Sequence, residues 1–198
     1  LLTWNNESSP IFSTQKQDNE FITSLSCNNI TYGQTPTPTI TAKFGTPYFM
    51  YSTSINGDFN LQIPINAGEY YVKAVVAETE SFTGLESEPI SFVIEKAPDV
   101  ITLTHENLNK TYDGLNFIPP TATSLSNSTI YYKYFYKTDE LYENEINAPI
   151  NAGFYTLKIY TLESNNYLST TKLIDFIIEK ANLTNLTQNL ETTYNNNN

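Results

Sequence analysis

The sequence has one cysteine, one histidine and few basic side chains, and each shortage excludes a class of structure or activity. Cys27 has no second cysteine with which to form an intrachain disulfide, so apolar cores must stabilise the fold, and a lone cysteine is typical of a small buried side chain. Catalysis by Ser-His-Asp or Cys-His requires a positioned imidazole, and His105 is the only histidine, expected in an exposed link between repeats. The sequence therefore predicts no catalytic residue and no enzyme.

Positive charge and long apolar runs are also scarce. Ten Lys and Arg residues stand against 21 Asp and Glu, which gives a net charge of −11. Such a chain repels a phosphate backbone or an anionic lipid surface, which argues against nucleic acid and direct membrane contact as partners. The sequence contains no run of 18 or more apolar residues, so we expect any export signal or anchor to lie outside this stretch.

Patterns that hold metals and cofactors are missing as well. No Cys/His spacing suits zinc, and no Gly-rich turn leads from a strand into a helix to hold phosphate. Carboxylates cluster at 78–88 and 139–145, but neither cluster matches the Asp-x-Asp-x-Asp loop that wraps calcium. We interpret them as solvated loop charge, and the sequence predicts no cofactor and no metal site.

What is abundant favours strands. The chain has 15 Tyr and 11 Phe residues, with Thr, Ile and Asn throughout, and no long stretch with a helical apolar period. The sequence therefore predicts an all-β protein.

An internal repeat divides the chain. Residues 64–68, Pro-Ile-Asn-Ala-Gly, recur 85 residues later at 149–153, and residues 94–97, Ile-Glu-Lys-Ala, recur 84 residues later at 178–181. A fixed period of this length indicates tandem modules. We predict a linker or the degenerate end of a preceding repeat at 1–20, repeats at 21–97 and 98–181, and the start of a third repeat at 182–198.

Short alternating segments separated by Gly, Pro, Asn and Asp predict the strands of a β-sandwich. In the first repeat these segments are 21–26, 37–44, 47–53, 58–63, 69–77 and 89–95. Alternation places Tyr70, Val72, Ala74 and Val76 inside. In the second repeat it places Tyr134 and Tyr136 inside and leaves Tyr131 and Phe135 on the outer face.

The repeated Asn-Ala-Gly-x-Tyr segments, 66–70 and 151–155, resemble the immunoglobulin-fold signature Asp-x-Gly-x-Tyr-x-Cys. The resemblance implies that Tyr70 and Tyr155 form tyrosine corners, in which the hydroxyl bonds back to the backbone. Val72 and Leu157 stand at the cysteine position, which fits a relative without the inter-sheet disulfide. The implied fold is two immunoglobulin-like β-sandwich domains. The short connection from Ala97 to about Ile101 favours an end-to-end arrangement.

More narrowly, the order of motifs in residues 29–97, and more loosely in 109–181, resembles the MBG-type and related bacterial immunoglobulin-like repeats. These occur in tandem in large microbial cell-surface proteins and adhesins. The resemblance implies an extracellular stalk or spacer at a cell surface, with neighbouring repeats of the same chain as its partners. Such repeats share no catalytic residues.

The aromatic run at 131–136 offers an alternative function. Its outward-facing Tyr131 and Phe135 form a candidate platform for a host glycan or a host surface protein. An accessory module of a secreted glycosidase is a further alternative.

The sequence also contains Asn-x-Ser/Thr sequons, which are candidates for N-glycosylation in a eukaryotic host and have no such meaning in most bacteria. They lie at Asn6, Asn29, Asn109, Asn127, Asn182 and Asn185.

Overall fold

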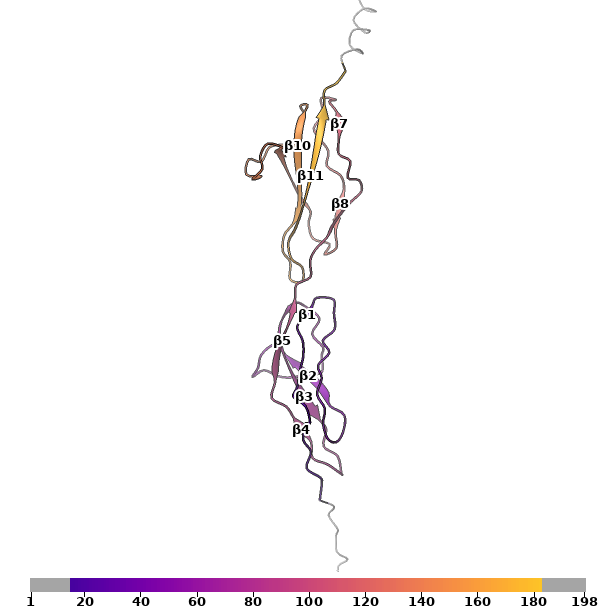
Figure 1. The fold of residues 1–198 in the computed structure, drawn as a ribbon, viewed down its shortest axis with the longest axis vertical. Coiled ribbons are helices and arrows are strands. Elements are labelled where there is room, and N and C mark those ends of the chain that lie inside the picture. The colour runs from indigo at the N-terminus through magenta and orange to yellow at the C-terminus, as the bar shows by residue number, and fades with distance from the viewer. Residues whose placement is uncertain (1–14, 183–198) are drawn as a thin grey trace, which may run out of the picture. The chain divides into compact units, whose positions relative to one another are not determined.

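The computed structural model describes residues 15–182 and divides the chain into two compact units between Lys96 and Ala97, one residue before the expected boundary. Both units are built from strands and loops, which confirms the all-β prediction (Figure 1). Within the described residues there is no helix long and apolar enough to cross a membrane.

The first unit contains one sheet of five strands. In chain order they are β1 (Ile30–Thr31), β2 (Tyr48–Ser52), β3 (Gly68–Val76), β4 (Leu85–Glu86) and β5 (Ile90–Glu95). The order across the sheet is β1-β5-β3-β2, and β4 pairs with the far part of β3. Strands β1 and β5 run parallel, whereas the other pairs are antiparallel.

A second, less regular layer covers this sheet. Its backbone joins at two antiparallel bridges, Phe21 to Ala42 and Ser26 to Thr39. Leu25 and Cys27 from this layer pack against the buried cluster of Tyr51, Val72, Phe92 and Ile94. Core residues therefore come from both layers, as in a sandwich.

The second unit repeats this plan with longer strands. They are β6 (Ile101–Leu103), β7 (Lys110–Thr111), β8 (Ala122–Ser124), β9 (Tyr131–Tyr136), β10 (Gly153–Thr161) and β11 (Thr170–Glu179). One sheet has the order β7-β11-β10-β9, and β6 pairs with β8 in the other. The core joins Ile101 of β6 to buried side chains of β9, β10 and β11, including Leu157, Ile159 and Phe176. Both units are immunoglobulin-like β-sandwiches.

In both units, the first residues hydrogen-bond to the turn that follows the long central strand, β3 or β10. The amide of Gln17 donates to the carbonyl of Ser81 at 2.9 Å, and Thr83 donates back to Gln17 at 3.0 Å. In the second unit Ala97 donates to Asn166 and receives from Leu168, both at 2.9 Å. Gln17 and the residues that follow it therefore bond to the first unit, in a stretch where the sequence predicts a linker or the degenerate end of a preceding repeat.

Three predicted strands of the first unit are wrong. Segments 21–26, 37–44 and 58–63 contain isolated bridges instead of strands. Pro36 and Pro38 lack the amide that a ladder requires at the entry to the second segment. In this layer, hydrogen bonds between backbone amides and side chains replace part of the backbone ladder. The amide of Thr41, for example, donates to Thr23 Oγ1 at 2.8 Å.

Candidate functional site

The predicted aromatic platform is only half present. Tyr131 is 39% exposed and its ring stacks on Tyr160 with 5.3 Å between centroids. Phe135, in contrast, is 1% exposed, so its assignment to the outer surface is wrong. Tyr136, expected inside, is 54% exposed at the end of β9. A platform formed by Tyr131 and Phe135 together is therefore excluded by the burial of Phe135.

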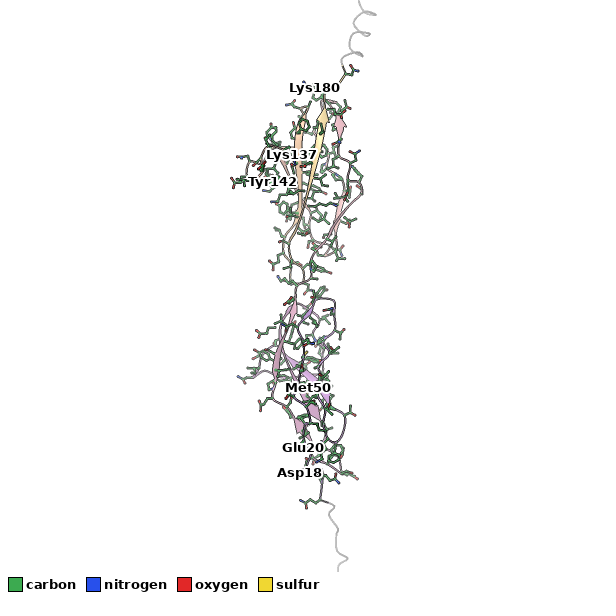
Figure 2. All side chains as sticks on the ribbon, viewed as in Figure 1. Asp18, Glu20, Met50, Lys137, Tyr142 and Lys180 are labelled. Carbon is green, nitrogen blue, oxygen red and sulfur yellow. The ribbon has the colours of Figure 1, made fainter. Side chains whose placement is uncertain are left out.

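Phe135 is buried because the segment after β9 folds back over the outer face of the sheet. The ring of Tyr142 from this segment packs edge-on against Phe135 at 5.6 Å, and Figure 2 shows Tyr142 and Lys137 beside the sheet. Thr156, opposite Phe135 on β10, is fully buried and donates to Asp175 at 2.7 Å. A strict inside/outside alternation fails at Phe135 and Thr156 because the outer face of the sheet is also covered at this point.

Tyr70 and Tyr155 make matching hydrogen bonds. The Tyr70 hydroxyl donates to the carbonyl of Asn66 at 3.0 Å, and the Tyr155 hydroxyl donates to the carbonyl of Asn151 at 2.9 Å. Both bonds return to the backbone four residues upstream, as expected of a tyrosine corner. A Cβ at Gly153 would lie 3.0 Å from the Tyr155 hydroxyl, which explains why glycine precedes this corner. Burial, and then the charge of Tyr136, raises the pKa of Tyr155.

Two of the sequon asparagines have a structural role. Oδ1 of Asn29 accepts the amide of Val93 in β5 at 2.9 Å, and Oδ1 of Asn109 accepts the amide of Ile177 in β11, also at 2.9 Å. Each asparagine directly precedes the short strand that pairs parallel with the last strand of its unit. We call this arrangement the terminal clamp. In each unit the asparagine side chain adds one hydrogen bond to the two-residue ladder between the parallel strands.

The other sequons differ in setting. Asn127 is exposed in the turn after β8, with a φ of 55°, in the left-handed region that asparagine tolerates. Asn182 is exposed at the end of the described chain. Asn6 and Asn185 lie outside the described residues.

A buried carboxylate lies at the start of the second unit. Asp99 is 6% exposed, and its oxygens accept from the Val100 and Ser126 amides at 2.9 and 3.0 Å and from the Ser126 and Thr161 hydroxyls at 2.7 and 3.0 Å. Burial raises the pKa of Asp99, but these four hydrogen bonds outweigh it and hold the pKa below its ordinary value. Sequence reasoning missed this residue because a single Asp after a proline carries no recognisable pattern.

The first unit places a neutral side chain in the corresponding position. Oδ1 of Asn19 accepts its own following amide, Glu20, and the cross-strand amide of Phe44, both at 3.0 Å. Phe21 and Ala42 form the bridge that corresponds to Ile101 and Ser124 in the second unit. The backbone geometry is therefore shared by the two units, whereas the buried charge belongs to the second alone.

Three of the clustered carboxylates make ion pairs at the surface. Glu78 pairs with Lys16, Glu86 with Lys73, and Glu145 with Lys133 at 2.8 Å. Across residues 15–182 no group of three or more His, Cys, Asp or Glu residues is arranged to hold a metal ion. His105 is exposed and lies after β6, inside the second unit and not between the repeats as expected.

A groove on the first unit went unnoticed in the sequence. It has a volume of about 440 Å³ and lies between the end of β2, the segment that follows, and the start of β3. Tyr51 and Ser52, which are 5% and 8% exposed, lie at its base. The residues that line the groove lie mostly in loops and show no strand period, so the sequence did not predict that they come together.

Comparisons with known proteins bear on the fold only. A scan against protein-family models finds no match, and a search of curated proteins finds none either. Among solved structures, the chain is similar to Drosophila N-cadherin EC1-3 at 13% identity and a TM-score of 0.32, over 84% of this chain and 69% of that one. It is also similar to the Clostridium thermocellum CbhA fibronectin(III)-like modules at 14% identity and a TM-score of 0.28, over 82% of this chain and 95% of that one. Drosophila N-cadherin EC1-4 is 15% identical with a TM-score of 0.30, over 82% of this chain and 50% of that one.

Proposed function

We propose that the two units form a non-catalytic, extracellular spacer within a larger cell-surface protein of the adhesin type. The observation that carries this proposal is the terminal clamp, which occurs with the same pairing in both units. A module whose task is spacing must keep its two chain ends tied to its core. The clamp joins the first part of each unit to its last strand.

The direction of the clamp strands suits a chain under tension. Strands β7 and β11 run parallel, with Lys110 opposite Ile178 and Thr111 opposite Glu179. Pulling the two ends of the unit apart slides these strands past one another, so their hydrogen bonds carry the load together and do not open one after another. The Tyr112 amide, which donates to Glu179 at 2.8 Å, and the Asn109 side chain add to the same set of bonds.

Single-molecule stretching tests this role. We expect the unmodified chain to unfold in two separate events, one for each unit. The variant Asn109→Ala removes one clamp bond of the second unit and should lower the force of one event only, and Asn29→Ala should lower the force of the other. Asn116→Ala, at an exposed asparagine of the same unit that lies outside the clamp, is the matched control. Equal unfolding forces for Asn109→Ala and Asn116→Ala would count against the clamp as the element that bears tension.

Glycosylation is part of the proposal where the host carries out that modification. Among the described sequons, Asn127 is the best candidate because it lies exposed in a turn, whereas the side-chain oxygens of Asn29 and Asn109 are bonded to the last strands. Expression in a eukaryotic secretory host followed by peptide mass mapping measures occupancy at each site. Higher occupancy at Asn29 or Asn109 than at Asn127 would contradict this ranking.

A further inference from the structure

The groove on the first unit is bounded by elements that hold it open. The Asn60 backbone bonds to Tyr51 in both directions, at 2.7 and 3.0 Å, which ties one wall to the edge strand β2. Asn60 Oδ1 accepts the amide of Gln62 at 2.8 Å, which fixes the turn into the opposite wall. The folded backbone therefore forms the walls of the groove.

The turn that closes one end is equally constrained. The Gly57 amide donates to the carbonyl of Ser54 at 3.1 Å, and a Cβ at Gly57 would lie 2.7 Å from Ser52 Oγ. Only glycine lets the turn approach Ser52 so closely. The approach brings Ser54 and Asp58 to the same groove.

The lining combines two kinds of surface. Hydroxyl and carboxamide groups come from Ser52, Ser54, Gln62 and Asn66, and Asp58 supplies one carboxylate. The apolar residues of the lining are Ile63, Pro64 and Ile65, and Tyr51 and Tyr70 also line it. Saccharides present the same combination, with hydroxyls around the ring edge and C–H groups on its faces.

The charge of the lining further limits the chemical class of ligand that the groove can bind. The lining contains no Lys, Arg or His, and its single charged residue is acidic. With a net charge of −11 on the whole chain, an anionic ligand would be repelled at long range and would find no cation in the groove. A phosphorylated, sulfated or sialylated glycan is therefore disfavoured against a neutral one.

We propose that this groove binds a neutral saccharide, with Asp58 and Gln62 bonding its hydroxyls and the Ile63–Ile65 wall contacting a ring face. The volume of about 440 Å³ lies within the roughly 300–1,000 Å³ of small-ligand sites. This site is independent of the spacer proposal and lies on a different unit from Tyr131. It would give the spacer a weak affinity for a glycan-coated surface.

The test is an NMR titration of the whole isotope-labelled chain with glucose, galactose, mannose, N-acetylglucosamine, N-acetylgalactosamine, lactose and cellobiose. At least one of these should shift the amide signals of residues 52–66 in a saturable way. The loop at 137–151 of the second unit serves as an internal control and should not respond. Failure of every saccharide in the panel to shift residues 52–66 at tens of millimolar would overturn the proposal.

Substitutions distinguish binding in the groove from binding at the surface around it. Gln62→Ala and Asp58→Ala should each raise the dissociation constant about tenfold, which corresponds to about 1.4 kcal/mol, the order of one hydrogen bond. Leu61→Ala is the matched control, because Leu61 is 66% exposed and does not line the groove. Ile65→Arg, at a position 71% exposed, should block the groove without disturbing the core. Unchanged binding in Ile65→Arg, or tighter binding of the 6-phosphate of the best sugar, would refute the assignment.

Discussion

Replacing Asp99 should destabilise the second unit alone and remove part of its acid sensitivity. Asp99→Ala leaves the amides of Val100 and Ser126, whose hydrogen bonds to Asp99 are part-buried, without their acceptor. The Ser126 hydroxyl has another partner in Ser128 Oγ at 2.7 Å, so its loss is partly compensated. The two amides and the buried Thr161 hydroxyl all lose their acceptor, and at about 1 kcal/mol each they predict a loss of about 3 kcal/mol in the free energy of unfolding.

Asp99→Asn is the informative comparison. An asparagine retains one carbonyl oxygen for the two amides, which is the arrangement that Asn19 already makes in the first unit. The hydroxyls of Ser126 and Thr161 then turn to accept from the new amide group. We expect a cost of about 1 kcal/mol at neutral pH.

The pH dependence has a definite sign. The pKa of Asp99 in the folded state lies below its ordinary value of 3.8, so the ionised carboxylate stabilises the second unit above that pH. This contribution is lost as the pH falls through the lower, folded-state pKa. The stability of the second unit should therefore decrease more steeply in acid in the unmodified protein than in Asp99→Asn.

Urea unfolding monitored by peptide-resolved hydrogen exchange measures both units in one chain. Asp99→Ala should lower the midpoint for peptides of the second unit and leave residues 17–96 unchanged. Asn19→Ala is the matched variant and should act on the first unit only. Equal acid sensitivity of Asp99→Asn and the unmodified protein would refute the role of the buried carboxylate.

Two further pairs of substitutions test the corners and the core of the second unit. Tyr70→Phe and Tyr155→Phe each remove one hydrogen bond and should lower the stability of their own unit by about 1 kcal/mol, and unchanged melting of both variants would count against the corner. Phe135→Ala should cost the second unit about 3 to 5 kcal/mol because Phe135 is 1% exposed, whereas Tyr131→Ala should cost less than 1 kcal/mol. Calorimetry that ranks these two variants in the opposite order would restore the surface platform.

The sequence was most informative where both copies obey one pattern. The repeated Asn-Ala-Gly-x-Tyr segment predicted two central strands with Val72 and Leu157 in the core, and both side chains are 0% exposed. The alternation predicted the core-facing residues of β3 and β10 correctly because each strand has hydrogen-bonded neighbours on both sides. Such strands are specified by their own apolar period.

Prediction failed where a distant segment decides burial. Phe135 reads as an outer residue by alternation, and only the return of Tyr142 over the sheet makes it a core residue. The polar layer at 21–26 and 37–44 satisfies its backbone partly through side chains, so its strands are broken into bridges. Likewise, the sequon pattern of Asn29 and Asn109 gave no sign of their bonds to the last strands.

Small-angle X-ray scattering distinguishes a spacer, in which the two units extend the chain, from a compact pair of units. Strands of about 8 residues at roughly 3.3 Å per residue, with end loops, give about 40 Å for each module, so two modules joined end to end span about 80 Å. A rod of that length and about 20 Å width has a radius of gyration near 24 Å, whereas a compact globule of this chain length has one of about 16 Å. The spacer proposal predicts the larger value. A measured value near the compact limit would contradict it, because the two units would then pack side by side.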